Sequence, residues 1–170
     1  MTDIVYRDGH VGDAAALAEL GARTFCDTFG HLYRPDDLAI FLENHRASNW
    51  AAELGDPAFA VRVAESGDAM IGYAKLGPPH LPFTPRGRAA ELRQLYVLDA
   101  WHGLGVAPVL MDWVIGQARL QQADHLYLSV FIDNHRARRF YRKLGFEEEG
   151  SYAFMVGNHA DEDIVMRLTL

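Results

Sequence analysis

Two glycines, Gly103 and Gly105, stand where an alternating apolar segment gives way to a long helical pattern. Glycine adopts backbone conformations that other residues resist, and it lets the backbone approach a ligand closely. Free N–H groups and the positive dipole end at a helix start favour an anionic group there. This segment therefore predicts a phosphate or pyrophosphate site, with an ordinary turn before a helix as the alternative. The predicted site residues are His102, Gly103, Leu104, Gly105, Val106 and Ala107.

Two common nucleotide-binding loops do not fit these glycines. The dinucleotide fingerprint requires a third glycine where this sequence has Pro108, and it usually lies in an early strand–helix unit. The phosphate loop of nucleotide hydrolases ends in Gly-Lys followed by Ser or Thr, which is absent here. Pro108 is compatible with a helix start, because its missing N–H falls in the first turn.

A second segment that could carry chemistry lies downstream and ends in Gly145. Asp133 or Asn134 can cap a helix there, and Gly145 suits its C-terminal end. Tyr141 has a phenol that could donate a proton, and a core aromatic with a satisfied hydroxyl is the alternative interpretation. The basic cluster of this segment fits either a solvated helix face or an anionic ligand. It comprises Arg136, Arg138, Arg139, Arg142 and Lys143.

Together, the two segments resemble the GCN5-related N-acetyltransferase (GNAT) family. The family's cofactor motif, Gln/Arg-x-x-Gly-x-Gly/Ala, falls on the six residues that begin at Ala100 and end at Gly105. Ala100 replaces the usual Gln or Arg, and His102 replaces the usual Arg, so the pyrophosphate should depend more on backbone N–H groups. A lost charge-assisted contact weakens binding by about 1.5–3 kcal/mol. The second family hallmark is matched by Asn134, Ala137, Tyr141, Lys143, Gly145 and Phe146.

The resemblance implies a fold and a cosubstrate. Members have a mixed α/β fold with a central, mostly antiparallel, twisted sheet of about seven strands, flanked by helices and splayed between the fourth and fifth strands. Acetyl-CoA would bind at that split, with its pantetheine arm paired to the backbone of Leu95, Tyr96 and Val97. Asn134 would contact the arm, and Tyr141 would lie near the sulfur as general acid. The resemblance implies one N-acetyltransferase domain over residues 1–170.

A general base is also needed, because the attacking amine must first lose a proton. The resemblance suggests Glu91, at a strand position where many relatives carry a glutamate, and a surface carboxylate is the alternative. Strand alternation should place Glu91 on one face with Arg93 and Leu95. His102 and His31 are lesser candidates. The eight histidines show no metal-ligand spacing, so no metal site is predicted.

The acceptor is expected to be a small primary amine. Residues 23–42 and 154–168 resemble the bacterial polyamine (spermidine/spermine) branch of the family, and Phe29, Tyr33 and Phe154 could wall the acceptor site. Two alternatives are a protein or peptide N-acetyltransferase and, from another class, a non-catalytic acyl-CoA-binding or sensing module. Acidic residues in both segments would suit a polycation, although solvated loops and helix caps also explain them. They are Asp27, Asp36, Asp37, Asp161, Glu162 and Asp163.

The elements that must position these residues follow from the period of the apolar residues. Alternation predicts strands, and a spacing of three or four predicts helices. Asp13 is the predicted cap of the first helix, and Pro35 opens the second. The predicted strands are 4–6, 59–65, 69–76, 88–98, 125–131, 146–156 and 164–170. The predicted helices are 13–29, one that starts at 35, 49–54, 103–122 and 134–144.

Composition excludes several classes of protein. A net charge of −7 argues against nucleic-acid binding, which needs clustered cations to neutralise phosphates. The single cysteine, Cys26, lies among apolar residues at helical spacing, so a buried structural thiol in a reducing compartment is favoured over a nucleophile. No membrane span or leader pattern is visible, so a cytoplasmic protein without a membrane partner is expected. The resemblance also allows a homodimer, for which the sequence shows no interface signature.

Overall fold

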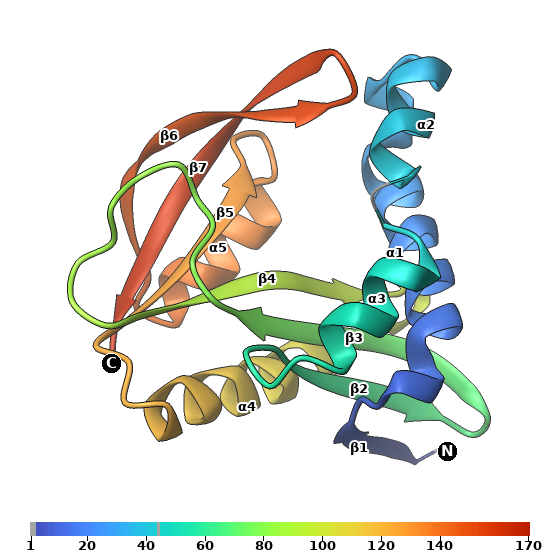
Figure 1. Ribbon diagram of the computed structural model, residues 1–170, viewed down its shortest axis with the longest axis horizontal. Helices are drawn as coiled ribbons and strands as arrows, with labels where there is room; N and C mark the ends of the chain where they lie inside the picture. The colour runs from blue at the N-terminus through green and yellow to red at the C-terminus, as the bar shows by residue number, and fades with distance from the viewer. Residues whose placement is uncertain (1–2, 44) are drawn as a thin grey trace.

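The computed structural model describes residues 3–43 and 45–170. Within them, seven strands form one sheet in the order β1-β2-β3-β4-β5-β7-β6 (Figure 1). Neighbouring strands are antiparallel except β4 and β5, which are parallel. The expected mostly antiparallel α/β sheet is thereby confirmed. The strands are β1 (Ile4–Asp8), β2 (Ala60–Ser66), β3 (Ala69–Gly77), β4 (Ala89–Val97), β5 (His125–Phe131), β6 (Glu147–Val156) and β7 (His159–Thr169).

Helices cover both faces of the sheet (Figure 1). Tyr73 of β3 packs with Leu17 and Trp50 on one face, whereas the next residue, Ala74, joins the cluster that contains Leu110 on the other. None of the described helices has the length and apolarity needed to cross a membrane. Two helices, α4 (Val106–Leu120) and α5 (His135–Lys143), pack in the cluster of Ala74. The opposite layer consists of α1 (Ala14–Phe29), α2 (Pro35–Glu43) and α3 (Ala47–Leu54).

The sheet divides between β4 and β5. Their ladder begins at the pair Ala89↔His125 and ends at Glu91↔Tyr127, although both strands continue beyond it. From Leu92 onward, the edge of β4 that faces β5 is therefore not paired with that strand. This is the split that the family resemblance implies.

A bulge in β4 changes which side chains share a face. Lys75 of β3 pairs with Gln94 and the next residue, Leu76, pairs with Leu92, so β4 contains one extra residue. Such a bulge interrupts strand alternation. Leu95 consequently packs in the same cluster as Leu92, opposite Glu91. The expectation that Glu91, Arg93 and Leu95 lie on one face is therefore wrong for Leu95.

Two helix starts also differ from the sequence expectation. The helix expected to start at Gly103 begins at Val106, because Gly103 and Gly105 have φ values of 76° and 85° and cannot be helical. Asp13 does not cap α1 with its side chain. It instead accepts two hydrogen bonds of 2.8 Å from the Arg7 guanidinium. Arg7 lowers the pKa of Asp13 to about 2.

The last strand begins earlier than expected. β7 starts at His159 instead of residue 164, because a tight turn at Gly157 and Asn158 joins it directly to β6. Asp161 and Asp163 consequently belong to a paired strand, opposite Phe154 and Tyr152. The alternative interpretation of this acidic segment as a solvated loop is therefore wrong.

The turn between β6 and β7 reaches α2 (Figure 1). The backbone N–H of Asn158 donates a hydrogen bond of 2.9 Å to Asp37, which is only 9% exposed. A Cβ at Gly157 would lie 2.5 Å from the Cα of Asp37. The contact holds the hairpin against the N-terminal helices, and it explains Asp37 without a role in substrate binding.

We predict that Gly157→Ala destabilises the protein more than Gly67→Ala does. The two glycines occupy hairpin turns with φ values of 59° and 60°, but a Cβ at Gly67 would meet nothing within 4 Å. Gly67→Ala should cost about 1–2 kcal/mol from the left-handed backbone alone. Gly157→Ala should cost about 1–3 kcal/mol more, because the Asp37 backbone must move. Urea unfolding measures both, and equal costs would contradict the close contact.

Candidate active site

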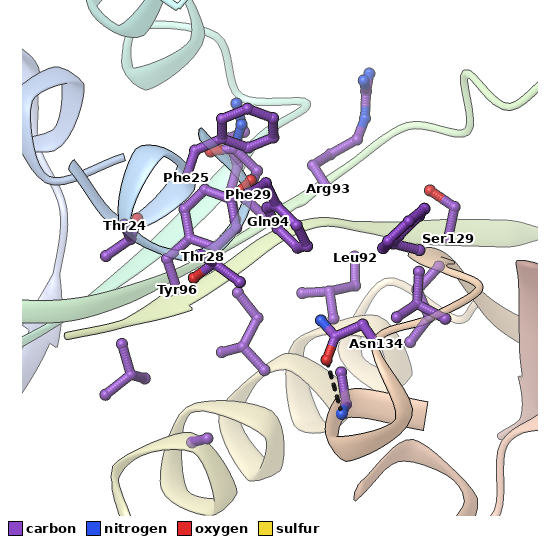
Figure 2. A pocket seen from close by; sticks show the side chains of 18 of the residues that line it. Thr24, Phe25, Thr28, Phe29, Leu92, Arg93, Gln94, Tyr96, Ser129 and Asn134 are labelled. Carbon is purple, nitrogen blue, oxygen red and sulfur yellow. Dashed lines mark hydrogen bonds between the residues drawn. The ribbon is translucent and has the colours of Figure 1, made fainter. Parts of the chain in front are cut away.

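A cleft of about 980 Å³ opens where β4 and β5 separate. Figure 2 shows Phe25 and Phe29 entering it from α1, and Ser129 and Asn134 lying on the side of β5 and α5. The predicted residues that line it are Tyr141, Glu91, Leu95, Tyr96, Val97, His102, Gly103, Gly105, Val106, Ala107, Asn134, Phe29, Tyr33 and Phe154. Leu104 and His31 do not line it, and the Leu104 side chain is largely exposed.

One end of the cleft suits a phosphate group. Gly103 and Gly105 both have positive φ, and a Cβ at either would meet nothing within 4 Å. The turn therefore leaves open space directly before the first residue of α4, Val106. Because the first N–H groups of a helix lack intrahelical partners, they are available to an anion in that space.

His102 links this turn to β4 and α5. Its Nε2 lies 2.7 Å from the Val97 carbonyl oxygen, and its Nδ1 contacts the Arg136 guanidinium. Since a carbonyl only accepts and a guanidinium only donates, this pattern fits a neutral ring with its proton on Nε2. Arg136 lines the cleft and adds a guanidinium beside His102. Sequence reasoning saw Arg136 only as one member of a basic cluster, of which Arg138 and Arg142 bind Glu148.

Asn134 caps α5 beside the cleft. Its Oδ1 accepts a hydrogen bond of 3.3 Å from the backbone N–H of Ala137, drawn as the dashed line in Figure 2. The cap leaves the amide nitrogen of Asn134 as a donor for a ligand. Of the two predicted caps, Asp133 and Asn134, the structure uses Asn134.

Tyr141 lies on α5 and is 8% exposed. Its ring packs against Phe140 and Phe146, and it lines the cleft. Burial raises the pKa of the Tyr141 phenol, and the neighbouring Tyr96 raises it further. Because the phenol stays protonated at neutral pH, it can act as a proton donor but not as a base.

Glu91 is buried at 2% exposure and contacts the 78–88 loop. Its carboxylate accepts hydrogen bonds from the backbone N–H groups of His80 and Leu81, at 3.2 and 3.3 Å. It also contacts the His80 ring and lies 3.4 Å from Arg93 Nε. These partners anchor the loop to β4, a role that sequence reasoning did not foresee.

Aromatic rings wall the opposite end of the cleft. Tyr33 stacks on Phe25 with ring centroids 5.8 Å apart, and its hydroxyl donates to Asp161. Phe29 meets Phe131 edge-on. Phe25 was considered only as an apolar neighbour of Cys26, yet it lies at the centre of this wall.

Asp163 is a buried acidic residue at this end, and sequence reasoning considered it only as one member of an acidic segment. It is 6% exposed and lines the cleft. Burial raises the pKa of Asp163 to about 6, a hydrogen bond from Ser129 opposes the rise, and Asp161 adds to it. Tyr152 in turn donates a hydrogen bond of 3.0 Å to Ser129.

Other candidate residues lie elsewhere. Asp27 is partnered with Arg23 on the surface of α1, and Asp36 is exposed in the first turn of α2. Among the described residues, no group of three or more His, Cys, Asp and Glu could hold a metal ion.

We predict that Asp163→Asn stabilises the protein at about pH 8 and changes little at about pH 4. The pKa of Asp163 is raised in the folded state from 3.8 to about 6, so the folded state holds its proton more tightly than the unfolded state. The stability that the protonated form contributes is therefore lost as pH rises through this window. The gain in the variant should be about 1–3 kcal/mol by urea unfolding. Asp161→Asn, which loses contacts to Tyr33 and His159, should bring no gain. Equal stability of Asp163→Asn and the natural protein at the higher pH would contradict the burial argument.

The geometry agrees with the relatives of this chain. Residues 22–146 match the family model described as Acetyltransferase (GNAT) family. An uncharacterized N-acetyltransferase of Mycobacterium bovis is 36% identical over 155 residues, which cover 91% of this chain and 96% of that protein. The L-amino acid N-acetyltransferase AaaT of Escherichia coli is 27% identical over 175 residues and covers 99% of each chain. The crystal structure of PaiA N-acetyltransferase from Thermoplasma acidophilum in complex with coenzyme A has a TM-score of 0.80 at 17% identity, over 99% of both chains. With a family match over most of its length and a split sheet of this topology, the chain belongs to the GNAT family of N-acetyltransferases.

Proposed function

We propose that this protein transfers the acetyl group of acetyl-CoA to the primary amine of a small molecule. The observation that carries the proposal is the single cleft that joins the glycine turn before α4, the protonated Tyr141 and a buried carboxylate. Family membership supports the reaction class.

The residues at the near end fit the cosubstrate. The open turn of Gly103 and Gly105 suits a pyrophosphate, and Arg136 adds a cation beside it. The edge of β4 at Leu95, Tyr96 and Val97 continues past the last pair with β5 and suits an extended amide-bearing arm. The Val97 carbonyl is shared with His102. Acetyl-CoA supplies the thioester carbonyl that an amine nitrogen can attack.

Tyr141 is the proposed general acid. Its buried phenol keeps its proton at neutral pH and can donate it to the departing sulfur. Asn134, at the start of the same helix, can orient the cosubstrate through its amide nitrogen. The cap places this side chain at the cleft, because α5 begins where β5 ends.

Two cleft residues can serve as the base. Glu91 is the candidate from the family resemblance, and a water molecule could carry the proton to it. However, its carboxylate already contacts His80, Leu81 and Arg93. Asp163 is the second buried carboxylate, at the end of the cleft that the aromatic rings wall.

The far end of the cleft favours a small amine with an apolar body. The rings of Phe29, Tyr33 and Phe154 can surround such a body, and an acidic group can hold its ammonium. A polyamine fits this description and stays the first candidate. Fewer carboxylates are available to bind it than the sequence suggested. Of the acidic residues considered for a polycation, those that line the cleft are Asp161 and Asp163.

Acetyl transfer to a protein or peptide is the second candidate. The turn that joins β6 and β7 contacts α2 through Asp37, so β7, which carries Asp161 and Asp163 in the cleft lining, is tied to the N-terminal helices that also line the cleft; this favours a small acceptor over a chain. A non-catalytic acyl-CoA sensor would need neither a protonated phenol nor a buried carboxylate in its cleft. Both are present here.

Free-thiol release from acetyl-CoA across a panel of amines tests the proposal. The panel includes spermidine, monoamines with aromatic or aliphatic bodies, amino acids, and a peptide with a free N-terminus. Turnover of small amines at rates well above the peptide is the expected result. A protein that binds acetyl-CoA but turns over none of these acceptors would overturn the proposal.

We predict that Tyr141→Phe keeps coenzyme A affinity and lowers kcat by on the order of 100-fold or more. The substitution removes the donor hydroxyl and leaves the ring that packs against Phe140 and Phe146. Isothermal titration with coenzyme A and thiol release separate the two effects. The control is Tyr6→Phe in β1, a hydroxyl deletion at a half-buried tyrosine outside the cleft. Full turnover by Tyr141→Phe would mean that another group donates the proton.

We predict that Gly103→Val combined with Gly105→Val weakens coenzyme A binding by on the order of 100-fold or more, because side chains fill the space before α4 and block its N–H groups. Gly67→Val is the matched control, since Gly67 also has a positive φ in an open turn but does not line the cleft. Titration calorimetry gives the affinities, and circular dichroism checks the fold. Unchanged affinity in the double variant would contradict the phosphate site.

A further inference from the structure

We infer that Asp163 is the catalytic base, which holds the ammonium group of the acceptor and takes the proton that its nitrogen must lose. The inference rests on the proposed function and deepens it. It assigns the proton to a carboxylate of β7 instead of Glu91 on β4.

The acidic residues that line the cleft differ in their partners. Glu53 binds Lys75 at 2.6 Å, and Glu91 contacts His80 and Arg93. Asp161 binds His159 at 3.0 Å and receives the Tyr33 hydroxyl. Asp99 is 70% exposed, so water solvates its charge.

Asp163 is the exception. No ion pair reaches it within the described part of the chain, and it is 6% exposed. A buried carboxylate without a cation is costly, because burial disfavours its charged form. A positively charged ligand in the cleft would supply the missing partner. The ammonium form of a primary amine has this charge and also carries the protons that the carboxylate can accept.

The surroundings of Asp163 orient it for this task. The Ser129 hydroxyl donates to its carboxylate, and Tyr152 donates to Ser129, so a short chain of hydrogen bonds fixes the side chain. Carboxylate oxygens accept several hydrogen bonds, which leaves acceptor capacity for a substrate N–H. Figure 2 shows Ser129 on the β5 side of the cleft, across from Phe25 and Phe29.

Tyr96 connects the proposed base with the proposed acid. Burial raises the pKa of Tyr96 and the charge of Asp163 raises it further, and burial likewise raises the pKa of Tyr141 with a smaller contribution from Tyr96. Tyr96, Tyr141 and Asp163 all line the same cleft, so an acceptor nitrogen bound there could approach both the carboxylate and the thioester.

The protons balance in the following way. The Asp163 carboxylate takes one proton from the ammonium, which leaves a neutral amine with a free electron pair. That pair forms the N–C bond to the acetyl carbonyl carbon as the C–S bond breaks. The sulfur receives a proton from Tyr141, and the nitrogen, which becomes an amide, loses a second proton that restores the phenol. Asp163 releases its proton to solvent, so one ammonium and one thioester give one amide, one thiol and one proton.

The groups that face Asp163 are acidic or neutral. Asp161 lies two residues away on β7, and Tyr152 of β6 pairs with Asp163. Ser129 faces Asp163 from β5, Tyr96 from β4, and Tyr33 from the segment after α1. None of them carries a positive charge, so protonation of Asp163 itself should set the acidic limb of activity. The base is competent when deprotonated, and activity should rise with pH through about 6.

Kinetics of Asp163→Asn test the inference. Thiol release is measured from about pH 5 to about pH 9 with two acceptors, an alkylamine with a pKa near 10 and an amine with a pKa near 8. The variant should lose on the order of 100-fold in kcat with the first amine, and clearly less with the second, which deprotonates more readily in water. The acidic inflection of the rate should disappear. Coenzyme A affinity should stay unchanged.

Two control variants separate this role from a structural one. Asp161→Asn removes a carboxylate on the same face of the same strand and should keep the acidic inflection. Glu91→Gln loosens the 78–88 loop and should also keep it, with an effect mainly on KM. If Glu91→Gln abolished the inflection and Asp163→Asn retained it, the inference would be overturned in favour of Glu91.

A readout independent of turnover completes the test. In carboxyl-labelled protein without cosubstrate, NMR should show an aspartate that titrates near pH 6 and is missing in Asp163→Asn. Added alkylammonium should lower that midpoint. An unmoved midpoint, or full turnover of Asp163→Asn beside an active natural protein, overturns the inference alone. A natural protein inactive with every amine overturns the proposed function itself, and the inference with it.

Discussion

The pairing of β4 with β5 stops at Glu91↔Tyr127, and the cleft depends on this stop. Both strands run in the same direction, so their carboxyl ends lie at one edge of the sheet, and the helix that follows each strand begins there. The glycine turn before α4 and the Asn134 cap of α5 consequently face the same opening. The contact between His102 and Arg136 joins the two helix starts. A continuous ladder would close the cleft and separate these groups from any ligand.

Most charged groups of the cleft are paired with a group of opposite charge. Lys75, Arg93 and His159 each contact a carboxylate, which makes their partners poor proton acceptors or fixes them as supports. The cleft keeps one acidic group, Asp163, apart from these pairs in a buried position. Such a group lowers stability above its own pKa, and functional sites often retain strain of this kind. Position within the sheet maintains it, because β7 lies between β5 and β6 and cannot shift without loss of two ladders.

Local patterns in the chain predicted much of the fold and many of the residues that line the cleft. The period of the apolar residues located most strands and helices to within a few residues. It missed the first part of β7 because His159 and the acidic residues after it are polar, although they pair with β6. The helix predicted from Gly103 was placed too early, because the period of apolar residues does not indicate the sign of φ. The positive φ values of Gly103 and Gly105 exclude both from the helix. Arg136 and Asp163 were considered only as members of charged segments, since each meets a partner on another element, His102 and Ser129.

By itself, the sequence determined the features that depend on residues close together in the chain. These are the glycine turn that opens a helix, the Asn134 cap, and Tyr141 further along the helix that Asn134 caps. Glycine conformations, caps and helical spacing act within one turn of chain, so residue order suffices to recognise them. Only the tertiary structure decided which of two buried carboxylates, Glu91 or Asp163, has ion-pair partners among the described residues. Glu91 and Asp163 are alike as side chains, but the loop at residues 78–88 folds onto the first and leaves the second facing the cleft. Desolvation and ion pairing depend on what lies across the fold, and residue order alone does not specify those neighbours.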